Sequence, residues 1–159
     1  MSNHPTPDEL REALAADTPS AKTKRDLIES ALYHFGHEGY AGTSTRSIAQ
    51  TAKTNIASIA YHFDGKAGLK RACINFIAMA LGDVVSVVMD RKLSDIEHLS
   101  PEEARAKIME MIDRIITFTQ TNKRAELVIG FMLKEVLHSP EEIETLYHLI
   151  FEPLMDRVT

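Results

Sequence analysis

The sequence predicts an all-α protein, and three observations support that prediction. Apolar residues recur every three to four positions along most of the 159 residues, which is the period of an amphipathic helix. The order Ser-Pro-Glu-Glu at residues 100–103 and 139–142 places a capping Ser, a first-turn Pro and a Glu three residues after the cap. No segment alternates apolar and polar residues as a strand would. Helices are therefore expected to begin near Pro101 and Pro140.

The N-terminal 20 residues favour no stable structure. They contain Pro5, Pro7 and Pro19 and few large apolar side chains. Residues 6–9 can start a short helix, but we expect residues 1–20 to form a flexible tail.

The first helix is predicted from Thr23, which can cap it, to about Glu38. Its apolar residues share one face, and they are Leu27, Ile28, Ala31, Leu32 and Phe35. This face is expected to pack on the two short helices that follow.

Those two short helices are predicted over residues 45–52, capped by Thr43 or Ser44, and over residues 56–63. The side chains assigned to their small core are Ile48, Ile59 and Phe63. The polar side chains expected to point outward from the second helix and the turn before it are Asn55, Ser58, Tyr61 and His62. A helix-turn-helix presents such groups to the major groove of DNA. The same geometry also occurs as a helical corner in proteins that never contact DNA.

The charge distribution agrees with a DNA-binding N-terminal part. Residues 20–73 hold eight basic and four acidic residues, a net charge of +4, whereas the rest of the chain carries −9. A basic end on an acidic protein directs one surface to phosphate and makes binding depend on salt. Alone, this excess would also fit an ordinary solvated face.

Besides the helix expected to begin near Pro101, three further helices are predicted after this unit. A long one over residues 66–92 has a continuous apolar stripe that includes Cys73, and it would span about 40 Å. Another, over 123–138 and capped by Thr121 or Asn122, follows the Pro101 helix and is apolar on more than one side, so it is either buried or has a second face for a partner or ligand. The last begins at Pro140 and is expected to be interrupted or kinked near Pro153.

The segment from Lys24 to Leu81 resembles the DNA-binding half of TetR-family transcriptional repressors. The matching elements, in order, are Phe35-Gly36, Glu38-Gly39-Tyr40, Thr43-Ser44-Thr45-Arg46, Ile48-Ala49, Ile59 to Phe63, and Lys66 with Leu69. Two positions depart from the family pattern. Lys53 stands where the family usually has a Gly in a left-handed turn, at a cost of roughly 1 kcal/mol, and Ala60 replaces an aromatic residue of the recognition helix.

The resemblance and the chemistry of the residues together define a candidate DNA-binding set. Its members are Thr45, Arg46, Thr54, Asn55, Ser58, Tyr61, His62 and Lys66. Lys66 falls in the first turn of a helix, where the backbone N–H groups and the helix dipole favour an anion. Each of these side chains can instead be a cap or simply solvated.

The resemblance also implies a homodimer that binds a pseudo-palindromic operator and responds to a small-molecule inducer. It suggests that the residues near the inducer pocket are Phe76, Met111, Ile115, Phe118, Phe131 and Tyr147. Aromatic and Met residues at helical spacing equally fit an ordinary core. The domains expected are a helix-turn-helix domain over 21–68 and a helical ligand-binding and dimerisation domain over 69–159. The latter is either truncated or dimerises through the sixth and seventh helices.

Several classes of protein are excluded by the sequence. The sequence has no apolar run of about 18 residues, which a membrane span would need. It also has no signal-like start, which would indicate a secreted protein. Cys73 cannot form an internal disulfide and is expected in the core, so the cytoplasm is the expected location. Phosphate loops, His-Glu-x-x-His patterns and nucleophile elbows are absent, so no enzyme, cofactor or metal site is expected. His34 and His37 lie one turn apart, but no further metal ligand is evident.

The sequence therefore predicts a DNA-binding transcriptional regulator, most simply a repressor that an inducer releases. Two alternatives remain open at this point. One is a helical small-molecule-binding or protein-interaction module that binds no DNA. The other is an architectural DNA binder whose affinity ignores sequence and follows salt alone.

Overall fold

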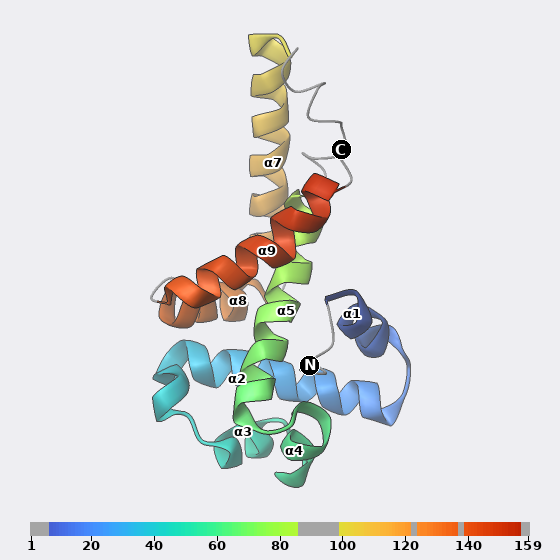
Figure 1. The fold of residues 1–159 in the computed structure, drawn as a ribbon, viewed down its shortest axis with the longest axis vertical. Coiled ribbons are helices and arrows are strands. Elements are labelled where there is room, and N and C mark those ends of the chain that lie inside the picture. The colour runs from blue at the N-terminus through green and yellow to red at the C-terminus, as the bar shows by residue number, and fades with distance from the viewer. Residues whose placement is uncertain (1–6, 86–98, 122–123, 137–138, 157–159) are drawn as a thin grey trace.

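The computed structural model describes residues 7–85, 99–121, 124–136 and 139–156, and these residues contain helices and no strand (Figure 1). The predicted all-α fold is therefore confirmed. The elements are α1 (Pro7–Ala15), α2 (Pro19–Gly42), α3 (Thr45–Thr51), α4 (Ala57–Phe63), α5 (Lys66–Val85), α7 (Pro101–Thr121), α8 (Ala125–Phe131), the π-helical segment η1 (Met132–Val136) and α9 (Pro140–Asp156). None of the helices within these residues combines the length and the hydropathy that a membrane crossing needs.

Helix α1 occupies part of the segment that we expected to be a flexible tail, so that expectation is wrong for its residues. Leu10 and Leu14 lie one turn apart and are buried, and the helix packs against α5 and α2. Asp8 and Glu9 lie in the first turn, where the helix dipole favours acidic side chains. Arg25 of α2 donates to the carbonyl of Leu14 and ties the end of α1 down. Long-range packing overrides the weak local signal of this segment.

Helix α2 starts earlier than predicted but breaks where it was expected to end. Thr18, not Thr23, is its cap, because the Thr18 hydroxyl accepts from the N–H of Ala21 at 3.1 Å and Pro19 takes the first helical position. Gly39 has φ 76° and ψ 161°, a conformation that interrupts the helix directly after Glu38.

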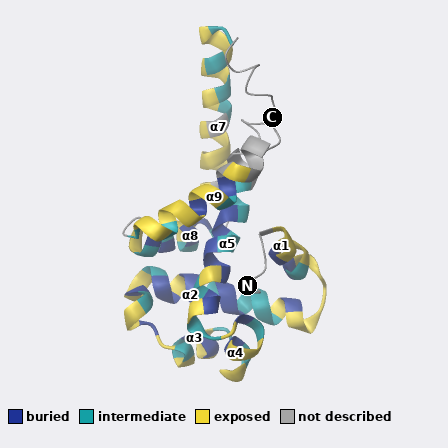
Figure 2. Cartoon of the chain, in the orientation of Figure 1, coloured by how far each residue is buried: buried dark blue, intermediate teal, exposed yellow. Residues whose placement is uncertain are grey.

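The core of the N-terminal part is formed by α2, α5 and the two short helices between them (Figure 2). Its largest fully buried side chains from these elements are Leu27, Ile28, Leu32, Phe35, Ile48, Ile59, Leu69 and Ile77. Cys73 lies in the same core, as predicted, and burial raises the pKa of its thiol. Gly68 lets α5 approach α4 closely, because a Cβ atom at this position would lie 1.6 Å from the carbonyl oxygen of Phe63.

The C-terminal half rests on α2 and α5. Helix α8 packs against α2 through two glycines, since a Cβ atom on Gly36 would lie 3.0 Å from the Gly130 backbone. The rings of Phe35 and Phe131 are 6.1 Å apart beside this contact. Helix α9 crosses α5, and α7 extends away from the N-terminal part (Figure 1). The predicted continuation of α5 from residue 86 to 92 lies outside the described residues.

The two Ser-Pro-Glu-Glu sequences start helices as predicted, but only the first forms the full capping box among the described contacts. The Ser100 N–H donates to Glu103 at 2.9 Å, and the Glu103 N–H donates to the Ser100 hydroxyl at 3.2 Å. At the second start, the side chain of Glu142 instead binds Lys70 of α5. A long-range ion pair replaces a local cap there.

The helix predicted over residues 123–138 consists of α8 followed by η1 in the described part of that range. Thr121 is the last residue of α7, and Asn122 lies outside the described residues, so the expected cap is not seen. Val128, Phe131 and Val136 are buried, whereas Ile129 and Leu133 are exposed. The segment thus has both a core face and an apolar outer face, as its composition predicted. Helix α9 runs past Pro153 to Asp156.

Candidate nucleic-acid interface

Helices α3 and α4 form a helix-turn-helix whose local signals lie in the sequence. The Ser44 hydroxyl caps α3 by accepting from the N–H of Ser47 at 3.0 Å. Lys53 has φ 53°, so the turn has the left-handed backbone that the family pattern implied at this position. Asn55 accepts from the N–H of Ala57 at 2.9 Å through its side-chain oxygen and so starts α4.

The apolar side chains of this unit face inward. Ile48, Ile59 and Phe63 are all buried, as predicted. The opposite face of α4 carries Tyr61, which is 85% exposed and is the most exposed large apolar or aromatic side chain among the described residues. The ring of His62 lies 4.8 Å from that of Tyr61 in an edge-on arrangement. The outer face of α4 therefore presents aromatic and hydrogen-bonding groups to solvent.

The remaining polar candidates lie along the same unit. Arg46 is exposed and Thr45 is half-buried, both in the first turn of α3. Thr54 and Ser58 are half-buried and share a hydrogen bond of 3.2 Å between their hydroxyls. That bond holds the turn to α4 and leaves each hydroxyl oxygen with further bonding capacity.

His62 has an unusual electrostatic environment for a surface imidazole. Partial burial and, to a lesser extent, the positive charge of Lys24 lower its pKa below the ordinary value of 6.5. The imidazole is therefore neutral near pH 7, when one ring nitrogen can donate and the other can accept a hydrogen bond. The influence of Lys24 also shows that α2 contributes positive charge to this surface.

Lys66 is less accessible than its position in the first turn of α5 suggested. Its ammonium group donates to the carbonyl oxygen of Tyr40 and lies 4.3 Å from the centroid of the Tyr40 ring. A phosphate bound by Lys66 would therefore share the ammonium group with the carbonyl oxygen and the ring of Tyr40. Sequence reasoning gave no sign of this contact, because the two residues are 26 positions apart.

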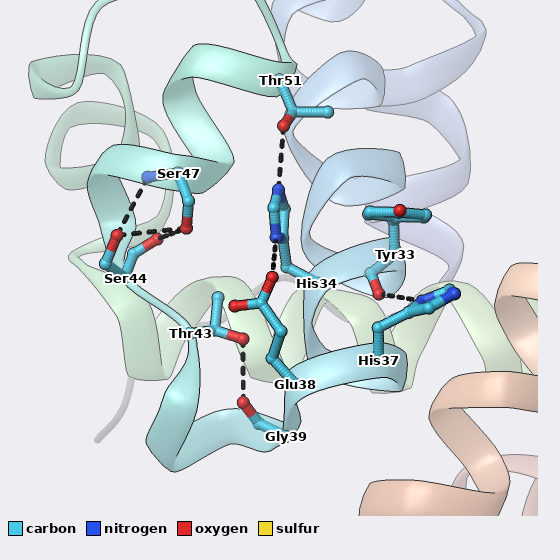
Figure 3. A network of polar contacts seen from close by, with 9 residues as sticks. All are labelled: Tyr33, His34, His37, Glu38, Gly39, Thr43, Ser44, Ser47 and Thr51. Atoms are coloured by element: carbon cyan, nitrogen blue, oxygen red, sulfur yellow. Dashed lines mark hydrogen bonds and ion pairs between the residues drawn. The ribbon is translucent and has the colours of Figure 1, made fainter.

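A buried histidine of α2, His34, joins α2 to α3 (Figure 3). His34 contacts Glu38 through Nδ1 at 2.9 Å and the Thr51 hydroxyl through Nε2 at 2.8 Å. His37 instead donates through Nδ1 to the carbonyl of Tyr33 at 2.8 Å, and its ring points away from α3 (Figure 3). The spacing of His34 and Glu38 was visible in the sequence, but the partner on α3 was not.

Of the six residues predicted near an inducer pocket, the structure describes the side chains of four. Phe131 is in the core, Phe76 is half-buried beneath the guanidinium of Arg124, and Ile115 and Tyr147 are exposed. The side chains of Met111 and Phe118 lie outside the description. The inducer pocket stays a prediction.

Comparison with known proteins identifies relatives of this chain. A sequence model described as "Bacterial regulatory proteins, tetR family" matches residues 27–73, the region of α2 to α5. The chain is 29% identical over 114 residues to the "Probable HTH-type transcriptional regulator YttP" of Bacillus subtilis, covering 72% of this chain and 50% of YttP. It is 38% identical over 95 residues to the "HTH-type transcriptional dual regulator CecR" of Shigella flexneri, covering 58% and 40% of the two chains. The chain thus spans half or less of these relatives.

A crystal structure from Shewanella sp. PV-4, of a protein with a tetR-family description, has a similar fold. The TM-score is 0.52 at 18% sequence identity, and the match covers 86% of this chain and 61% of the Shewanella chain. At this identity the similarity concerns the fold alone.

Proposed function

We propose that this chain, whose residues 27–73 match the model of the tetR family of bacterial regulatory proteins, is a sequence-specific DNA-binding regulator of transcription. The observation that carries this proposal is the helix-turn-helix of α3 and α4, whose apolar face is buried and whose outer face carries Tyr61. The two relatives that cover most of the chain are named as transcriptional regulators. We infer accordingly that the chain has no catalytic activity of its own and acts in the cytoplasm.

Two kinds of DNA contact are assigned to the candidate residues. Thr45, Arg46 and Lys66 bind backbone phosphates, which position the protein but carry no sequence information. Asn55, Tyr61 and His62, with Thr54 and Ser58 beside them, face the major groove and select the base sequence. Asn55 contributes the NH₂ of its side-chain amide as a donor, because the side-chain oxygen already accepts from the N–H of Ala57 at the start of α4.

We further propose that two copies of the chain bind one pseudo-palindromic operator. A second copy would place its recognition helix one helical turn of DNA away, about 34 Å. Several exposed apolar side chains on α7 support an interaction with another copy, and they are Ile108, Met109, Ile112, Ile115 and Ile116. In this arrangement residues 21–68 are the DNA-binding domain, and residues 69–159 dimerise and bind a small-molecule inducer that releases the repressor.

The experiment that tests this function is fluorescence-anisotropy binding to the DNA that flanks the gene of this protein. The same duplex with scrambled sequence serves as the control, at near-physiological salt. Binding that is at least a hundredfold tighter to the flanking DNA would support a sequence-specific regulator. Equal binding to both duplexes would favour an architectural DNA binder, and binding to neither would favour a module without DNA-binding activity.

A further inference from the structure

A cluster of charged side chains lies where the N-terminal part meets the C-terminal half. The Lys70 ammonium of α5 lies 2.9 Å from a carboxylate oxygen of Glu135 in η1 and 2.6 Å from one of Glu142 in α9. The three side chains are only 17%, 12% and 18% exposed. One cation of α5, the helix that connects the two halves, is therefore held by two carboxylates from separate C-terminal elements.

The second oxygen of Glu135 binds the backbone just after the break in α2. The N–H of Tyr40 donates to Glu135 Oε1 at 2.7 Å. A Cβ atom at Gly39 would lie 3.4 Å from the same oxygen, so the carboxylate lies close against this backbone. The Tyr40 ring lies 4.3 Å from the Lys66 ammonium and 4.9 Å from that of Lys70. Glu135 thus contacts the Gly39–Tyr40 segment and α5 together.

The charges of the cluster do not balance. Two carboxylates surround Lys70, and Glu142 Oε2 is buried without a hydrogen-bond partner among the described residues. Burial opposes the charge of Lys70, but the hydrogen bonds and charges of Glu142 and Glu135 outweigh it, so the pKa of Lys70 is raised. Buried charge clusters are weak evidence for stability, and in some proteins their directional contacts fix one geometry.

The element that carries Glu135 is itself unusual. Segment η1 is π-helical, and π-helical turns are rare and occur frequently at functional sites. Return of this turn to α-helical geometry would rotate Glu135 by roughly one residue, about 100°. That rotation would take the carboxylate away from Tyr40 and Lys70 together. A change within the C-terminal half can therefore break both contacts in one step.

We propose that Glu135 is a positioning residue that, through Lys70 and Tyr40, fixes the orientation of the DNA-binding unit relative to the C-terminal half. This inference rests on the proposed function, because orientation matters only when two copies must span two half-sites. A structural change in the C-terminal half would release the contact and alter the spacing of the recognition helices. The affinity for a single half-site would be unaffected, since α3 and α4 pack on α2 and α5 within one unit.

The test compares two DNA probes with the full chain. One duplex is selected from a random pool by the wild-type chain and holds two half-sites, and the other holds one of those half-sites. Glu135→Ala should weaken binding to the two-site duplex about tenfold and change binding to the half-site less than twofold. Glu135→Gln keeps an oxygen for the Tyr40 N–H and should restore part of that loss.

A matched control removes a carboxylate that the cluster does not contain. Glu152→Ala breaks the 2.7 Å contact between His148 and Glu152 on α9 and should leave binding to both duplexes unchanged. Unchanged two-site binding by Glu135→Ala would overturn the inference, as would an equal loss on both duplexes, which would indicate a general structural role.

A second readout does not depend on DNA. Amide hydrogen exchange at Tyr40 should accelerate at least tenfold in Glu135→Ala, whereas exchange at Thr43, whose N–H donates to the Gly39 carbonyl at 3.1 Å, should not change. Unchanged exchange at Tyr40 would contradict the inference even if wild-type DNA binding failed. If the wild-type chain selected no DNA but Tyr40 exchanged faster in Glu135→Ala, the result would count against the proposed function. The contact between Glu135 and the Tyr40 N–H would still be supported.

Discussion

At the scale of single residues, the candidate DNA surface depends on a few side chains that have no role in the core. Tyr61 is the clearest example, because its neighbours Ile59 and Phe63 are buried and it is not. Asn55 and Ser58 have a second role in holding the turn, through contacts of 2.9 and 3.2 Å. Substitution of Tyr61 should therefore separate binding from folding more cleanly than substitution of the polar candidates.

Tyr61→Ala should weaken binding to the preferred DNA about tenfold, which is about 1.4 kcal/mol, while leaving the unfolding temperature nearly unchanged. The loss reflects the removal of a large groove-facing side chain. Tyr33→Ala is the matched control, because Tyr33 is also exposed and lies on the side of α2 away from Thr51 (Figure 3). Anisotropy titrations and thermal unfolding measure the two properties. Equal DNA affinity of Tyr61→Ala and the wild type would contradict the assignment of α4 to the DNA interface.

The lowered pKa of His62 predicts a pH dependence of stability. Between the ordinary pKa of 6.5 and its lowered value in the folded state, the unfolded chain binds more protons at this site. The free energy of unfolding should therefore fall as the pH drops through this window and be unaffected by His62 above it. His62→Gln should show a shallower fall than wild type in urea unfolding between pH 7.5 and 5. Parallel curves for the two proteins would contradict this assignment.

At the scale of elements, the sequence predicted those helices whose ends are marked locally. The start of α7 and the cap of α3 were predicted from nearby residues, the left-handed turn at Lys53 was implied by the family resemblance, and the structure confirms all three. The elements that were missed depend on distant partners. Helix α1 is held by burial of Leu10 and Leu14 against other helices, and the second capping Glu is drawn to Lys70. Local signals cannot report contacts across the fold.

The close approach of α4 and α5 predicts a strong requirement for glycine. Gly68→Ala should destabilise the protein by about 2–4 kcal/mol, because the new methyl group would overlap the carbonyl oxygen of Phe63. Gly82→Ala in the same helix is the control, since no atom of the described residues beyond its own helical turn lies within 4 Å of a Cβ atom there. It should be neutral or stabilising by up to about 1 kcal/mol. Chemical unfolding of both variants measures the difference, and equal stabilities would contradict close α4–α5 packing.

At the scale of the whole molecule, the two halves differ in charge and in exposure. The N-terminal part is basic, and its helices enclose a compact core, whereas α7 extends outward with exposed apolar side chains (Figure 2). The long-range contacts between the halves, such as Gly36 with Gly130 and Lys70 with Glu135, had no signal in the sequence. The candidate DNA residues followed from motif and spacing, but the partners that position them did not.

The most direct test of the central claim is hydrogen–deuterium exchange of the full chain with and without its selected DNA duplex. We expect DNA to protect the amides of residues 44–63, which cover α3, the turn and α4. The start of α5 should also be protected, and the outer face of α9 should change much less. Protection confined to other elements, or none at saturating DNA, would contradict the assignment of this helix-turn-helix as the DNA-binding surface.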